Sequence, residues 1–338
     1  MKRMMWSNLA WVDDVIKSRA ALIAVAIVGT TACQADVTSH PPVAGVPAPA
    51  ASAGYPIHTF ASDADFGAKN VDMGLTGAAG FQWYVFNFFG YRPSSALTTF
   101  NADGSVTIAQ YPGRGPDTNL ASAASIPSAP HYRGTAFGGG GYFEATLAWD
   151  HATVDEVGAW PAWWTMSLEH MAGLPGRLWP GQGANYEHFV EPDIVEDDLG
   201  KSYKNAYGGN VHDWYGQLET TCPHHVFCDI DLPFMAVVRT VPAGTDFNAW
   251  HRYGFLWIPA TSAKAGSISY WFDGVRVGLT TIYYRLPPRA TPPAGAPWTF
   301  SVIDDQHLVL ILGTGASTPL RVRDVDVWQA SAAGNLHN

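Results

Sequence analysis

Charged residues are scarce in this chain. Only 14% of its 338 residues are Asp, Glu, Lys or Arg, and 29 acidic residues against 19 basic ones give a formal net charge of −10. Nucleic acids and anionic membrane surfaces are bound through basic patches, which this composition does not favour. We therefore expect no nucleic-acid partner.

The chain also lacks a long apolar run near its N-terminus. After residue 35 it shows no convincing amphipathic helical pattern. Its 14 Trp, 14 Tyr, 34 Gly and 24 Pro suit short strands separated by turns. Alternating apolar runs recur between Gly, Pro and Asp turns, for example at 141–149, 253–257, 268–274 and 320–328. The sequence thus predicts an all-β protein, a β-sandwich of the jelly-roll type.

The N-terminal residues 1–35 resemble an export signal. A short apolar stretch at 20–29, too short to span a bilayer, follows four basic residues and precedes small ones. Two endings stay open: cleavage after Ala32 or Ala35, or a lipid on Cys33, which would be the chain's only attachment to a membrane. Either ending predicts an extracytoplasmic protein that is secreted, periplasmic or lipid-anchored to the outer face.

Residues 36–54 are rich in Pro, Ala and Ser and predict an extended linker. Nothing after residue 55 resembles a second linker, since the Pro-rich stretch at 286–297 fits a surface loop. We therefore expect a single domain over residues 55–330, and a monomer.

Cysteine is rare, with three residues in all. Cys222 and Cys228 enclose a short loop, and in an oxidising compartment we expect them to form a disulfide. The alternative is a metal site built with His224 and His225, whose spacing matches no known zinc pattern. We expect no metal in the functional site.

Three acidic residues, Glu191, Asp193 and Glu196, lie within the apolar, β-prone stretch 189–196. Side chains alternate between the two faces of a strand, so Glu191 and Asp193 share a face and Glu196 would point away. One extra residue bulged out near Ile194 and Val195 would bring Glu196 back to their face. The alternative is a solvated acidic edge with no function.

Three acids on one face would repel one another, which favours keeping at least one of them protonated near neutral pH. A carboxylate beside a protonated carboxylic acid is the pair that glycoside hydrolysis requires. The pattern therefore indicates a site that cleaves sugar chains.

Several segments together resemble glycoside hydrolase family 16, the laminarinase and lichenase group. The segment Glu191-Pro-Asp193-Ile-Val-Glu196 is similar to the family's Glu-x-Asp-x-x-Glu strand in its bulged form. Gly141-Tyr-Phe-Glu-Ala and Trp160-Pro-Ala-Trp-Trp164 precede it in the expected order, and Val211-His212-Asp-Trp214 follows it. Segments at 246–257, 271–274 and 320–329 match the rest, so the resemblance covers about residues 59–329. Pro192 departs from the family's preference for Ile, Leu or Val.

The resemblance implies a concanavalin-like jelly roll with a concave substrate cleft and a retaining double displacement. Glu191 would be the nucleophile, Glu196 the general acid and then the base, and Asp193 would tune the charge of the nucleophile. His212 would orient Asp193 or Glu196. Three tryptophans, Trp160, Trp164 and Trp179, would lie in the cleft and stack on sugar rings.

The resemblance also implies an endo-acting enzyme on a β-linked polysaccharide partner, a β-1,3 or mixed-linkage glucan. A galactanase or a transglycosylase of the same family would use the same residues. A non-catalytic, lectin-like carbohydrate-binding jelly roll is the alternative from another class. No cofactor is required; relatives often hold a structural calcium ion, but no dense Asp/Asn loop in this sequence specifies one.

Overall fold

The computed structural model describes residues 45–62, 66–67, 69–85, 92–111, 118–154, 160–176, 186–197, 199, 203–216, 228–231, 238–285, 299–314 and 318–338. The chain divides into two compact units, residues 1–38 and 39–338, and all the described residues belong to the second unit. That unit is an all-β jelly roll built around two eight-stranded sheets.

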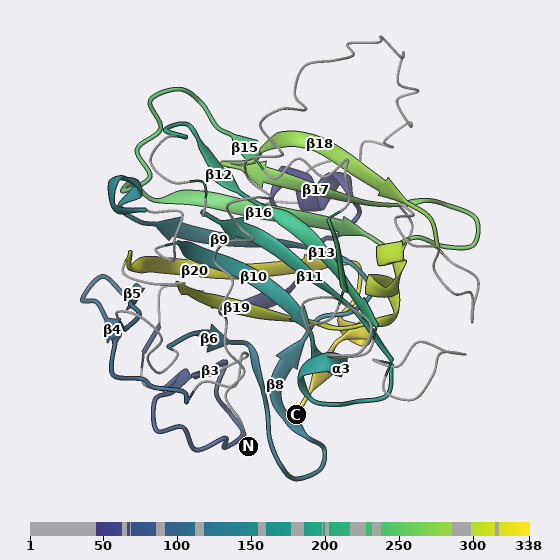
Figure 1. Ribbon diagram of the computed structural model, residues 1–338, viewed down its shortest axis with the longest axis horizontal. Helices are drawn as coiled ribbons and strands as arrows, with labels where there is room; N and C mark the ends of the chain where they lie inside the picture. Colours follow the sequence, from purple (N-terminus) through teal and green to yellow (C-terminus); the bar gives the residue numbers. More distant parts are fainter. Residues whose placement is uncertain are drawn as a thin grey trace. The chain divides into compact units, whose positions relative to one another are not determined.

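Sheet I runs in the order β18-β17-β16-β9-β20-β5-β4, with β1 also paired to β20 (Figure 1). Every pairing within it is antiparallel. Its strands are β1 (Ile57–Ala61), β4 (Thr98–Phe100), β5 (Val106–Ile108), β9 (Gly141–Ala148), β16 (His251–Ile258), β17 (Gly266–Phe272), β18 (Val275–Tyr283) and β20 (Leu320–Gln329).

Sheet II runs in the order β14-β13-β11-β10-β19-β6-β3-β2, and β10, β11 and β19 lie side by side in Figure 1. Only its terminal pair, β2 and β3, is parallel. Its strands are β2 (Val71–Asp72), β3 (Trp83–Val85), β6 (Leu120–Ala121), β10 (Pro161–Ser167), β11 (Glu187–Glu196), β13 (Asn210–Gly216), β14 (Cys228–Asp231) and β19 (Leu308–Thr314).

Smaller elements connect or cover the two large sheets. Strands β7 (Ala123–Ser125), β8 (Tyr132–Ala136) and β21 (Leu336–His337) form one small sheet, and β12 (Ala206–Gly208) and β15 (Val238–Thr240) form another. Helices are short: α2 (Ala48–Ser52), α3 (Leu168–Met171), and the 3₁₀ turns η1 (His151–Thr153), η2 (Thr299–Asp305) and η3 (Ala332–Gly334).

The main hydrophobic core fills the space between sheets I and II. Phe143, Phe255 and Val327 reach it from sheet I, and Trp163 and Leu310 reach it from sheet II. Because strand side chains alternate, the neighbours of these residues along each strand project outward, away from the core. Each sheet therefore has an outer face, and the outer face of sheet II carries the three predicted acids.

The alternating patterns in the sequence correspond to observed strands. The run at 141–149 forms β9, and the run at 268–274 forms β17 and its turn into β18. Asp273 and Gly274 adopt positive φ values of 48° and 77° between the paired residues Phe272 and Val275. This is the two-residue hairpin that an Asp-Gly pair favours.

The structure differs from the sequence prediction at the end of the proposed linker. Residues 48–52 form α2, with Pro47 leading into it, and Ala50 is fully buried. Ala50 and Tyr55 pack on Tyr142, Leu256 and Trp328 on the outer face of sheet I. The composition of residues 36–54 predicts an extended linker, but small side chains also allow a helix to lie close against a sheet.

Among the described residues, no helix is both long and apolar enough to cross a membrane.

Candidate active site

Strand β11 carries the predicted acids and changes register in the middle. Trp163 and Trp164, consecutive residues of β10, face Val195 and Asp193 of β11, so Ile194 has no counterpart. This is a β-bulge, which puts two residues of one strand opposite one of its neighbour. The predicted bulge near Ile194 and Val195 is confirmed, and it is what changes the direction of the side chain at position 196.

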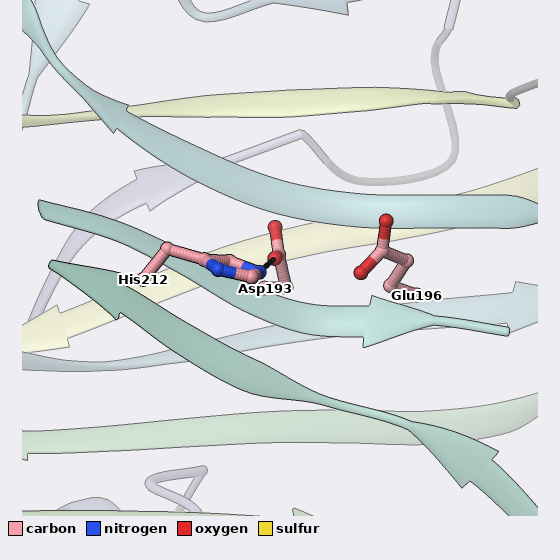
Figure 2. A group of neighbouring side chains, drawn as sticks. All are labelled: Asp193, Glu196 and His212. Carbon is pink, nitrogen blue, oxygen red and sulfur yellow. Dashed lines mark ion pairs between the residues drawn. The ribbon is translucent and has the colours of Figure 1, made fainter. Parts of the chain in front are cut away.

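Asp193, Glu196 and His212 come together on the outer face of sheet II. One ligand atom of each side chain lies within 4.8 Å of those of the other two. Figure 2 shows His212 pointing toward Asp193, with Glu196 further along β11, and the His212 Nε2 to Asp193 Oδ2 distance is 3.1 Å. Asp193 is buried, whereas Glu196 and His212 are half-buried.

Glu191 lies on the same face of β11 as Asp193, two residues before it. It faces His212 across the β11–β13 pairing and is half-buried. The indole Nε1–H of Trp214 donates a 2.6 Å hydrogen bond to Glu191 Oε2. A bond this short to a carboxylate favours the ionised form and fixes its orientation.

Pro192 is accommodated because β11 pairs differently on its two sides. Pairing with β13 runs without interruption from Glu187 to Asp193, while pairing with β10 covers only Asp193 to Glu196. A proline has no N–H to give to a ladder, and here the β10 ladder starts only after it. The hydroxyl of Thr165 on β10 donates to the Pro192 carbonyl at 3.3 Å instead.

Trp164 and Trp160 lie at the apolar part of the same outer face. Trp164 belongs to a cluster with Phe189 and Ile311 that β7, β8 and α3 cover, and only 5% of its surface is exposed. Trp160 is half-buried at the edge of that cluster. Trp164 pairs with Asp193 in register, so it supports the floor beside the acids rather than offering an open ring face.

Several predicted residues lie outside the description. Trp179, Cys222 and Cys33 are not among the described residues, and of Cys228 only the backbone, at the start of β14, is described. The predicted disulfide and the third tryptophan remain predictions.

A buried anchor at the end of β11 was not anticipated from the sequence. Asp197 is fully buried and accepts hydrogen bonds from Trp149 Nε1 and His151 Nδ1, each at 2.7 Å. Burial alone would lower the pKa of His151, but the hydrogen bond to Asp197 and its charge outweigh burial, and the pKa is raised. The Asp197 N–H also donates to the Pro161 carbonyl, so the position of Glu196 is fixed from the following residue.

Asn119 is a second residue of this face that sequence reasoning missed. Gly313 on β19 faces Ala162 on β10, which in turn faces Glu196 on β11. A Cβ on Gly313 would lie 1.5 Å from the Asn119 side-chain oxygen, so this amide occupies the space that a side chain at 313 would fill. The buried side chain of Asn119 thus places a polar group next to Gly313, two strands away from Glu196.

At the other end of the acid row, His170 and Glu187 form a hydrogen-bonded pair. His170 of α3 stacks on Phe189 with ring centroids 3.6 Å apart, and its Nδ1 lies 2.5 Å from Glu187 Oε2. The packing of Phe189 on Trp214, with centroids 6.4 Å apart, continues this row of rings toward Glu191. The stacked rings of His170, Phe189 and Trp214 stabilise the start of β11 and the end of β13.

Asp193, Glu196 and His212 are also spaced so that they could hold a metal ion, and they are the only such group among the described side chains. Calcium prefers six to eight oxygen ligands. A group that offers one histidine nitrogen and two carboxylates does not fit it. The chemistry of the trio suits proton transfer better than calcium binding.

Comparison with known proteins gives distant likenesses only. No family model matches the chain, and no curated protein matches it. Among solved structures, the chain is similar to an endo-1,3-beta-glucanase from Streptomyces sioyaensis, at 17% identity and a TM-score of 0.43 over 83% of this chain and 97% of the other. It is also similar to LamAcat from Zobellia galactanivorans, at 15% identity and a TM-score of 0.40 over 81% and 98%. Peanut lectin matches at 11% identity and a TM-score of 0.31 over 68% and 88%.

Proposed function

We propose that this chain is an exported, retaining endo-glycoside hydrolase of the family 16 type that cleaves a β-linked polysaccharide. The observation that carries the proposal is the bulge at Ile194, because it puts Glu196 on the outer face with Asp193 and His212. Without it, the fifth residue after Glu191 would point into the core.

Glu191 is the nucleophile in this proposal. The Trp214 indole at 2.6 Å supports an ionised and oriented carboxylate, which is what attack on an anomeric carbon needs. Attack forms the glycosyl–Glu191 ester and breaks the glycosidic bond, while Glu196 gives its proton to the leaving oxygen. Glu196 then removes a proton from water, whose oxygen attacks the anomeric carbon and releases Glu191.

Asp193 and His212 position and tune the two glutamates. A carboxylate within 4.8 Å of Glu196 disfavours a second negative charge there, which supports a protonated acid in the resting enzyme. The contact between His212 Nε2 and Asp193 Oδ2 at 3.1 Å offsets the cost of burying Asp193. In this proposal Asp193, contacted by His212, carries the negative charge, and Glu196 carries the proton.

The substrate we propose is a β-1,3 or mixed-linkage glucan. The test is an assay of sugar release from laminarin, lichenan, agarose and xyloglucan by the full chain and by Glu191→Gln and Glu196→Gln. We expect each variant to lower kcat/KM on the cleaved polymer by about 10²–10⁴-fold or more. Glu187→Gln is the matched control, because Glu187 lies on the same face of β11 but pairs with His170, and it should keep activity within about tenfold.

A second measurement separates the roles of the two glutamates. With an aryl β-glycoside whose leaving group needs no acid, azide should restore turnover of Glu196→Ala by replacing the base-activated water. The product should be the glycosyl azide of retained configuration. Unchanged sugar release by both glutamine variants would exclude the mechanism.

Other outcomes distinguish the alternatives. Measurable binding of a polymer without release from any of the four would instead indicate a lectin-like protein. Release from agarose alone would indicate a galactanase, and transfer to an added sugar acceptor in place of water would indicate a transglycosylase.

A further inference from the structure

A cavity of about 380 Å³ opens on sheet I, far from the acids in the topology of the fold. It is lined by Asn101, Asp103, Ser105, Thr107, Trp250 and Arg321, among others. Its volume falls in the range of small-molecule sites, about 300–1,000 Å³. None of these residues belongs to the site described above.

The cavity lies on the outer face of sheet I. Thr107 of β5 and Arg321 of β20 face one another across the pairing, while their neighbours Val106 and Val322 are buried in the main core. Thr107 and Arg321 therefore project on the side opposite the core. The acids project from the outer face of sheet II, so the two sites lie on opposite sides of the sandwich.

Two guanidinium groups are held against one indole at the cavity. The Cζ atoms of Arg321 and Arg323 lie 5.2 and 4.4 Å from the centroid of the Trp250 ring. Arg321 and Arg323 lie two residues apart on β20, on either side of the core residue Val322, so both project from the outer face. Stacking on an aromatic face fixes the plane of a guanidinium, so both are pre-organised.

The donors of these arginines are largely unused by the described part of the chain. Arg321 gives one N–H to the Asn248 carbonyl at 2.5 Å. Within the described ranges, neither Arg321 nor Arg323 forms an ion pair with a carboxylate. A guanidinium has five N–H donors in a planar fork that matches a carboxylate.

Hydroxyl and amide groups complete the wall. Asn101 Nδ2 donates to Ser105 Oγ at 3.0 Å and to Thr107 Oγ1 at 2.9 Å, and Ser105 Oγ donates to Asp103 Oδ1 at 2.6 Å. The Ser105 hydroxyl and N–H lower the pKa of Asp103, and the charge of Arg323 adds to this. Asp103 is therefore an ionised acceptor suited to the hydroxyls of a sugar, in a network already ordered without a ligand.

We infer that the outer face of sheet I carries a second glycan site, which takes a sugar unit bearing a carboxylate. Arg321 in the cavity wall and Arg323 beside it, both held by Trp250, receive the carboxylate, and the Asn101, Thr107 and Asp103 side chains receive the hydroxyls. The site binds and does no chemistry.

The test is affinity electrophoresis of the full chain carrying Glu191→Gln, in gels containing polygalacturonate or the neutral polymer laminarin. We expect polygalacturonate to retard the protein, with the effect weakening as NaCl is raised, because exposed charge pairs are screened by salt. Arg321→Gln with Arg323→Gln should raise the dissociation constant about tenfold or more. Arg276→Gln is the matched control, since Arg276 lies on β18 of the same sheet outside the cavity, and it should bind as its parent does.

Two further variants keep the test decisive if the double variant is unstable. Thr107→Val removes one hydroxyl, and Arg321→Lys preserves charge and removes the fork; each should weaken binding when measured at a temperature well below its own thermal unfolding midpoint. Retardation that is equal in parent and arginine variants, or equal loss with Arg276→Gln, would overturn the inference. Retardation by laminarin that Trp250→Ala abolishes but the arginine variants do not would overturn the carboxylate requirement.

Discussion

Gly313 determines which polar group lies beside Ala162 on the outer face of sheet II. Its missing side chain leaves the space that Asn119 fills, with the Asn119 oxygen 1.5 Å from the position of an added Cβ. The sequence of either strand alone does not predict that the Asn119 side chain fills the space beside Gly313. The two residues are brought together only by the pairing of β6 with β19.

We expect Gly313→Ala to lower the free energy of unfolding by about 1–3 kcal/mol, because the added methyl group must displace the Asn119 amide. In Asn119→Ala the remaining Cβ lies 3.4 Å from the added methyl position, an ordinary contact. The double variant should therefore recover stability, with a coupling of about 1 kcal/mol or more in a double-mutant cycle measured by urea unfolding. Effects that simply add would show that the two residues do not compete for this space.

The bulge in β11 is the element that decides which side chains share a face. Deleting Ile194 removes the bulge, so the Glu196 side chain should point into the core. Activity should then fall to the level of Glu196→Gln. The deletion also removes a buried side chain, so loss of fold must be separated from loss of geometry.

Ile194→Ala is the control for that separation. It keeps the residue count and the bulge while removing a core side chain, and should cost about 2–5 kcal/mol of unfolding free energy. Below its unfolding temperature, it should still release sugar at a rate close to that of the parent. Equal loss of activity in both variants, each shown folded by near-UV circular dichroism, would mean that the bulge does not control the site.

The sequence was informative where the signal is local. The Asp273-Gly274 hairpin and the bulge near Ile194 follow from residue chemistry and from parity over a few positions, and both are observed. The sequence could not show how Pro192 is accommodated in β11, because this depends on where the pairing with β10 begins. The same holds for α2, since its packing on Tyr142 depends on a sheet built from distant strands.

The candidate site was partly accessible from the sequence for the same reason. Asp193 and Glu196 lie three residues apart, so one local irregularity explains their meeting with His212. Asp197, anchored by Trp149 and His151, was missed because its partners lie more than 40 residues away, on other elements. The sequence signal that could have identified Asp197 was an acidic residue directly after an apolar strand pattern.

At the scale of the whole molecule, Asp304 ties η2 to sheet I. Its carboxylate accepts hydrogen bonds from Tyr283 at 2.5 Å, Trp257 at 3.2 Å and the Ala260 N–H at 3.1 Å. Burial raises the pKa of Asp304 to about 6, although those hydrogen bonds and the nearby charge of Arg285 act in the opposite direction. The folded protein therefore holds this proton more tightly than the unfolded chain does.

This linkage has a definite sign. Stability contributed by protonated Asp304 is fully present below the ordinary aspartate range and is lost as the pH rises through about 6. Relative to Asp304→Asn, the parent should lose at most about 3 kcal/mol of unfolding free energy between pH 4 and pH 7. The measurement is urea unfolding of both proteins across that range, with Asp305→Asn, an exposed neighbour, as the control. A constant difference between parent and Asp304→Asn would contradict the assignment.

The cavity and the acids lie on opposite sides of the sandwich: Thr107 and Arg321 on one side, Glu191 and Glu196 on the other. This arrangement limits whether one polysaccharide chain can occupy both sites. Packed sheets are about 10 Å apart, so a strand lying flat along one surface does not reach the other. A protein held by its Trp250 side to one strand would present its acids to a neighbouring strand. In a dense matrix, such tethering would raise the local concentration of cleavable bonds without any tighter grip on them.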